Sequence, residues 1–74
     1  MSLLLISPES QIFEFVIFHK FKNDVIQKAN NENFSNKDFS YWLYNWLQDE
    51  KYPKEINLYH VDYDKVRFKI QHIT

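Results

Sequence analysis

Glycine and cysteine are both absent from this chain of 74 residues. At the usual frequency of about 7%, roughly five glycines would be expected at this length. Phosphate-cradling loops, nucleophile elbows and dinucleotide-binding fingerprints all use glycine for positive φ or for close approach of the backbone. The best-known catalytic and nucleotide-binding motifs are therefore excluded together.

The lack of cysteine excludes a disulfide framework and any thiolate metal site. A small domain that uses neither is typical of the cytoplasm, and we predict that location. The opening residues MSLLLI lack the length and basic flank of a signal peptide, and no apolar run approaches the ~18 residues of a membrane span. We expect no membrane association, and whether the chain is a whole protein or a fragment stays open.

Charge of one sign is lacking too, because nine Lys+Arg face ten Asp+Glu and leave a net charge of −1. Such a balance lacks the basic excess that is typical of nucleic-acid binding. Lysine outnumbers arginine eight to one, with seven asparagines and seven isoleucines beside them. This bias is typical of AT-rich coding and favours a bacterial or phage origin.

Aromatic residues are abundant, with seven Phe, five Tyr and two Trp. The length predicts a single domain over residues 1–74, and a chain of this size buries only about 60% of its unfolded surface. Large aromatic rings, which each bury about 150–250 Å², compensate for this small buried surface, and self-association is another way to compensate for it.

A helix-start signal stands near the beginning of the chain. Ser7 fits the N-cap, Pro8 the first helical position and Glu9 the first turn. We predict one helix from there to about Lys28. Residues 12–18 are nearly all apolar, so periodicity leaves helix or strand open for that stretch.

The second predicted helix has the clearest local signals. The asparagine-rich segment 30–33 ends the first helix, since asparagine tolerates the left-handed conformation of a helix C-terminus. Ser35 with Asp38 resembles a capping box, and Phe34 and Phe39 occupy the positions of a hydrophobic staple. The apolar stripe that follows, with helical spacing, contains Phe39, Trp42, Leu43, Trp46 and Leu47. We therefore place both tryptophans in the core and end the helix before Pro53.

From residue 56 the apolar pattern changes to alternation. The segments 56–61 and 66–71 flank Asp62, Tyr63 and Asp64, which predicts a β-hairpin. An odd loop places His60 on the buried face together with five apolar side chains: Ile56, Leu58, Val66, Phe68 and Ile70. An even loop would bring Tyr59 and Val61 there instead, so the register stays open.

The order of elements predicts an α+β fold. Two helices would pack on one face of a small antiparallel sheet, made of the C-terminal hairpin and a candidate short N-terminal strand at residues 3–6.

Residues that could carry chemistry are sparse and poorly spaced. Asp62, Tyr63 and Asp64 resemble the first ligands of a calcium loop, but that loop's glycine and distal glutamate are missing. No metal-ligand spacing joins the three histidines, which are His19, His60 and His72. The serines fit helix caps or exposed helix positions better than a nucleophile beside a base. We predict no metal, no cofactor and no enzymatic activity.

Tyrosines outside the predicted core are the candidate partner-binding residues. Tyr41 and Tyr44 lie off the apolar stripe of their helix, and Tyr59 and Tyr63 fall outside the predicted core of the hairpin. Exposed tyrosine is enriched at protein interfaces because it offers contact area and a hydroxyl at low entropic cost. We assign partner binding to Tyr41, Tyr44 and Tyr59.

Three basic residues, Lys65, Arg67 and Lys69, alternate along the last predicted strand and would project from one face. Such a row could contact a nucleic-acid backbone or form the wing of a winged helix. Charged residues on the exposed face of an edge strand also prevent aggregation without any ligand, and we favour that interpretation.

The leading function hypothesis is a small non-enzymatic protein-interaction module. It would bind a protein partner or a second copy of itself as a homodimer, or act as an inhibitor or regulator that occludes its partner. The alternative is a winged-helix-like DNA-binding protein, which the balanced charge and the two evident helices disfavour.

Overall fold

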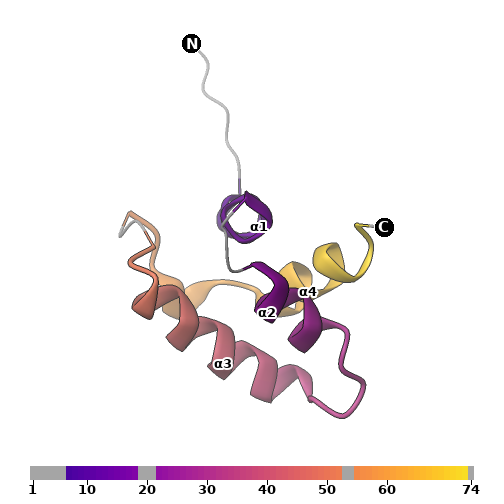
Figure 1. Cartoon of the computed structure of the whole chain (residues 1–74). Coiled ribbons are helices and arrows are strands. Elements are labelled where there is room, and N and C mark those ends of the chain that lie inside the picture. Colours follow the sequence, from indigo (N-terminus) through magenta and orange to yellow (C-terminus); the bar gives the residue numbers. More distant parts are fainter. Residues whose placement is uncertain (1–6, 19–21, 53–54, 74) are drawn as a thin grey trace.

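Helices are the only regular secondary structure in the described residues, which are 7–18, 22–52 and 55–73 of a computed structural model. These residues form four α-helices, α1 (Pro8–Phe18), α2 (Lys22–Ala29), α3 (Asn36–Asp49) and α4 (Tyr63–Gln71). A 3-10 turn, η1 (Leu58–His60), lies between α3 and α4. Helix α4 packs against each of the other three α-helices, so the core forms around it (Figure 1). The predicted α+β fold is therefore wrong, and the candidate strand at 3–6 lies outside the described residues.

The two predicted helix starts are confirmed. The Ser7 hydroxyl accepts a hydrogen bond from the Ser10 N–H at 3.2 Å, and the Ser35 hydroxyl accepts one from the Asp38 N–H at 3.0 Å. Each serine satisfies a helix N–H that has no partner within the helix. Local capping chemistry was enough to fix where α1 and α3 begin.

The single helix predicted over residues 8–28 is wrong, because α1 ends at Phe18 and α2 begins at Lys22. Figure 1 looks along α1 while α2 runs across the view, so the two axes differ in direction. At about 100° per residue, one straight helix would point Val16 and Val25 in opposite directions. Both side chains are fully buried, and only two differently oriented helices can turn them into one core. Residues 12–18 are helical.

The predicted hairpin is wrong as well, because residues 63–71 form α4. Asp62 acts as its N-cap, with its carboxylate accepting a hydrogen bond from the Lys65 N–H at 3.3 Å. The buried residues of α4 are Tyr63, Val66, Arg67 and Ile70. Their i, i+3, i+4, i+7 spacing is helical. The pattern of apolar residues in the sequence does not reveal this spacing, because one of the four buried residues is an arginine.

The turn after α3 contains the sole positive φ among the described residues, 59° at Lys51. The Tyr52 N–H donates to the Leu47 carbonyl at 2.9 Å and the Lys51 N–H to the Gln48 carbonyl at 3.1 Å, which is a Schellman motif. The expectation of a left-handed residue in segment 30–33 is therefore wrong. That segment ends α2 through side-chain bonds instead, such as the Asn30 amide to the Ile26 carbonyl.

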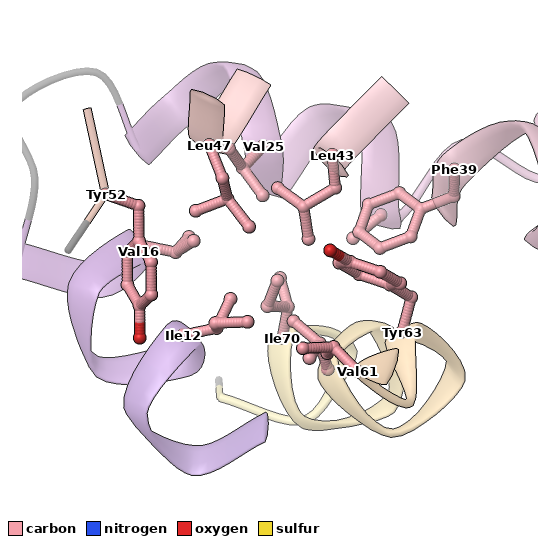
Figure 2. Close-up of a cluster of buried hydrophobic side chains, with 12 residues drawn as sticks. Ile12, Val16, Val25, Phe39, Leu43, Leu47, Tyr52, Val61, Tyr63 and Ile70 are labelled. Carbon is pink, nitrogen blue, oxygen red and sulfur yellow. The ribbon is translucent and has the colours of Figure 1, made fainter. Parts of the chain in front are cut away.

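The core takes side chains from all four α-helices, from Tyr52 in the turn after α3 and from Val61 directly after η1 (Figure 2). Phe39, Leu43 and Leu47 form the fully buried stripe of α3. Trp42 and Trp46 were predicted in that stripe, but both are half-buried and pack against its side. Their rings stack with centroids 6.3 Å apart, and Trp46 meets Phe15 of α1 edge to face.

Candidate functional site: a tyrosine groove

Two adjoining hollows lie between α3 and the segment 55–61. The first has a volume of about 400 Å³ and is lined by Lys37, Ser40, Tyr41, Tyr44, Leu58, Tyr59 and Tyr63. The second, of about 250 Å³, is lined by Tyr44, Gln48, Tyr52, Ile56, Asn57, Leu58 and Tyr59. Tyr44, Leu58 and Tyr59 belong to both linings, so the hollows form one continuous depression, referred to below as the tyrosine groove.

Helix α3 forms one wall of the groove with the side that faces away from the core. Its buried stripe of Phe39, Leu43 and Leu47 anchors the helix. Tyr41 and Tyr44 then project from other sides; Tyr41 is 73% exposed and Tyr44 is half-buried. The buried stripe fixes the helix to the core, and the rings of Tyr41 and Tyr44 remain accessible at the surface.

The opposite wall is the 3-10 turn, and Asn57 shapes it. The Asn57 side-chain oxygen accepts a hydrogen bond from the Tyr59 N–H at 3.0 Å, and its carbonyl accepts one from the His60 N–H at 3.0 Å. This cap presents Tyr59, which is 80% exposed, to the groove. The rings of Tyr59 and Tyr44 have their centroids 5.7 Å apart, so the two walls meet through an aromatic pair.

Beneath the turn, Tyr63 and Tyr52 form a buried floor. The Tyr63 hydroxyl donates a hydrogen bond of 2.7 Å to the Leu58 carbonyl, and burial raises the pKa of Tyr63 well above its usual value. Burial, reinforced by Glu55, also raises the pKa of Tyr52, whose ring meets Phe15 edge to face at 5.0 Å. Both hydroxyls therefore stay neutral at physiological pH. Among the described residues that line the groove, Lys37 alone carries a charged side chain.

The structure brings together the three tyrosines predicted to bind a partner. Tyr41, Tyr44 and Tyr59 all line the first hollow, although 15 residues separate Tyr44 from Tyr59 in the sequence. The fourth tyrosine predicted outside the core, Tyr63, is buried, and that prediction is wrong. Lys37, Gln48 and Leu58 also line the groove. No sequence signal marks Lys37 and Gln48 among the polar positions of α3, and Leu58 was predicted on the buried face of a hairpin strand.

The three basic residues predicted on one face of a strand all lie on α4, and the helix points Arg67 in a different direction from Lys65 and Lys69. Lys65 and Lys69 are exposed, one turn apart, whereas Arg67 is only 7% exposed and belongs to the buried stripe. The common face on which the nucleic-acid hypothesis rested does not exist. The wing of a winged helix is missing as well, since no hairpin is present in the described ranges.

Arg67 is a structural residue at the C-terminal end of α2. Its Nε donates to the Ala29 carbonyl at 2.9 Å, Nη2 to the Asn31 carbonyl at 2.9 Å, and Nη1 to the Asn36 side-chain oxygen at 2.8 Å. The guanidinium also lies over the Phe39 ring, 5.2 Å from its centroid. None of these partners is charged, but the carbonyls carry the negative end of a helix dipole.

No group of three metal-ligating side chains occurs in the part of the chain that the structure describes. His60 and His72 are both exposed, and the Nδ1 of His72 lies 2.8 Å from the Phe68 carbonyl of its own helix. Asp62, considered above as a calcium ligand, is a helix cap, and His19 lies outside the described residues. Across the same residues, no helix has the length and apolarity to cross a membrane.

Comparison of the chain with protein-family models, curated proteins and solved structures finds no match. The chain is therefore classified by its own features. Over the described residues these define a small all-α domain whose four helices enclose one core and whose surface carries a tyrosine-lined groove with Lys37 at its edge.

Proposed function

We propose that this protein is a small non-enzymatic interaction module that binds its partner through the tyrosine groove. The observation that carries the proposal is the exposure of Tyr41 and Tyr59 on facing walls of one depression. Their rings occupy the surface of a domain whose core is already filled by other residues. Tyrosine at a concave surface is the typical anchor of a protein interface.

The character of the groove favours binding over catalysis. A nucleophile must have a base within hydrogen-bonding reach, and a general acid or base needs a pKa near the working pH. Around the groove the resolved shifts raise tyrosine pKa values further from neutrality. A partner bound here would be held by ring contacts and hydroxyl hydrogen bonds, and occlusion of the partner is the simplest regulatory consequence. The cytoplasm remains our proposed location, based on the absence of cysteine.

Site-specific photo-crosslinking tests the proposal. A benzophenone amino acid in place of Tyr59 should form a covalent adduct with a second polypeptide in the cells that make the protein. The same probe in place of Phe68, which is 60% exposed on α4, is the matched control and should not. Tyr41→Ala should abolish the adduct at position 59. Adducts of equal yield at positions 59 and 68 would contradict an interface centred on the groove.

Size-exclusion chromatography with light scattering then separates the two kinds of partner. A mass of two chains that reverts to one in the Tyr59→Ala variant would identify a second copy as the partner. A monomer that still forms the crosslinked adduct would identify a different protein.

A further inference from the structure

We infer that the tyrosine groove binds a short proline-rich peptide in the polyproline II conformation, with an acidic residue of the peptide next to Lys37. This inference rests on the proposed function and names the chemistry of the partner. Its support comes from the shape of the groove, the groups that line it and the charge of Lys37.

The shape consists of two hollows with an aromatic pair between them. Tyr44 and Tyr59, with ring centroids 5.7 Å apart, stand between a hollow of about 400 Å³ and one of about 250 Å³. A polyproline II helix has three residues per turn and presents apolar rings at regular intervals along one side. Aromatic-lined depressions receive such ridges, and two hollows offer places for two successive turns.

The lining groups match the backbone of such a peptide as well as its rings. In the described chain, no hydrogen bond occupies the hydroxyls of Tyr41, Tyr44 and Tyr59, whereas the hydroxyl of Tyr63 is committed to the Leu58 carbonyl. A polyproline II segment has no internal hydrogen bonds, so its carbonyls remain available to hydroxyl donors. An α-helical ligand satisfies its own carbonyls and would bury tyrosine hydroxyls without partners, at a cost.

Charge complementarity sets the acidic position of the peptide. Lys37 lies on the first turn of α3 and is the one charged residue among the described residues that line either hollow. A helix N-terminus adds partial positive charge in the same place, so a carboxylate of the ligand is favoured there. A single-stranded nucleic acid would need a row of cations along its backbone, which this lining lacks.

The exposed area argues against a second copy of the chain. Tyr41 is 73% exposed and Tyr59 80%, which corresponds to roughly 300 Å² of ring surface for the pair. A stable dimer buries about 800 Å² on each subunit. The groove is therefore matched to a ligand of a few residues rather than to a folded surface.

Fluorescence anisotropy with labelled peptides on the whole chain provides the test. The probes are Pro-Pro-Leu-Pro-Pro-Glu, its reversed sequence, the same peptide with Gln for Glu, and a control with Ala for every Pro. At least one acidic probe should bind with a dissociation constant of about 10–100 µM, and the alanine control about tenfold more weakly. Tyr41→Ala and Tyr59→Ala should each weaken binding about tenfold, and Phe68→Ala should not.

A second pair of variants tests the charge. Lys37→Ala should weaken the glutamate peptide about two- to fivefold and leave the glutamine peptide unchanged, because an exposed ion pair contributes little. Lys65→Ala, an exposed lysine of α4, is the matched control and should change neither. Equal losses for both peptides in Lys37→Ala would overturn the assigned acidic position.

The remaining outcomes separate this inference from the function on which it rests. If no proline peptide binds while the benzophenone at position 59 still captures a partner, the peptide class is wrong and the interaction function stands. Dimerisation through Tyr59, or binding of an oligothymidine in place of the peptides, overturns the inference in favour of that ligand. If neither peptide nor crosslinked partner is found, both proposals fail.

Discussion

The tyrosine groove and the Arg67 site differ in an unexpected way. The charged arginine is buried, whereas the largely apolar rings of Tyr41 and Tyr59 are exposed. Arg67 is inside, 7% exposed, with hydrogen bonds from three nitrogens and a ring beneath it. Tyr59 is outside, 80% exposed, although most of its surface is an apolar ring. The helix α4 supports both, because Tyr63 and Arg67 lie one turn apart in its buried stripe.

The difference shows that partners, rather than polarity, decide which of these side chains is buried. A guanidinium can be buried when nearly every donor has an acceptor, and burial without them would be very unfavourable. The rings of Tyr41 and Tyr59 stay exposed because the core is complete without them. One site contributes to folding stability, and the other is free to bind.

The largest expected effect breaks the Arg67 site. Arg67→Ala should lower the free energy of unfolding by about 3 kcal/mol or more. It leaves the Asn31 carbonyl and the Asn36 side-chain oxygen without their donor, and it removes one of the two donors to the Ala29 carbonyl, which keeps the Gln71 amide. Urea melts followed by circular dichroism measure the loss. Lys65→Ala on the exposed side of the same helix is the control and should stay within about 0.5 kcal/mol of wild type. Similar melts for both variants would contradict the structural role of Arg67.

The next largest effect is expected for a substitution at Tyr63, which lies in the floor of the groove and not in its walls. Tyr63→Phe removes the hydrogen bond to the Leu58 carbonyl and should cost about 1–1.5 kcal/mol, whereas Tyr59→Phe should cost almost nothing. Because the pKa of Tyr63 is raised in the folded protein, the stability linked to it is present below about pH 10 and lost above it. Melts at rising pH should therefore show a smaller alkaline loss in Tyr63→Phe than in wild type, and equal losses would exclude Tyr63 as the group responsible.

A third change sharpens the comparison by stabilising the turn that leads from α3 toward the groove. Lys51 holds a φ of 59°, which an L-residue adopts at a cost and glycine does not. Lys51→Gly should therefore raise the free energy of unfolding by about 0.5–1 kcal/mol, in a chain that has no natural glycine. Thermal melts against Lys37→Gly, which places glycine inside α3 and should destabilise, provide the control. Destabilisation by both would show that the Schellman turn is not strained.

The smallest effect concerns the contact between the first turns of α1 and α4. A Glu9 carboxylate oxygen accepts a hydrogen bond of 2.9 Å from the Asp62 N–H, and this bond lowers the pKa of Glu9. The linked stability is present above the unfolded pKa near 4.3 and is lost as the pH falls through the lower folded value. The stability difference between wild type and Glu9→Gln should therefore shrink below about pH 4. A difference that stays constant from pH 6 to pH 3 would contradict the assignment.

The starts of α1 and α3 were predictable because a cap acts within a few residues. Ser7 and Ser35 each bond an N–H three residues ahead, and no distant part of the chain is needed. The positions of Tyr41 and Tyr44 on α3 were predictable for the same reason: an apolar stripe along one side of a helix leaves Tyr41 exposed and Tyr44 half-buried beside the stripe. Tyr59 was assigned to partner binding on the wrong secondary structure, so its place in the groove did not follow from the argument that selected it.

The C-terminal third was decided by contacts that the sequence does not display. The alternation of Val66, Phe68 and Ile70 fits a strand, and the helical stripe becomes visible only when Arg67 is counted as buried. Its burial depends on carbonyls 36 and 38 residues away, at the end of another helix. The separation of α1 from α2 likewise follows from one core that both must face.

The amino-acid sequence by itself therefore determined the features that short-range chemistry controls, namely the helix caps, the position of Tyr41 and Tyr44 off the buried stripe of α3 and the absence of glycine-dependent motifs. Tertiary structure alone decided that an arginine lies inside, that residues 63–71 form a helix rather than a hairpin, and that Tyr59 faces Tyr44 across a groove. The physical reason is the range of the interactions. Caps and helical faces are fixed within one or two turns, whereas burial of a polar group depends on acceptors that only the folded chain assembles.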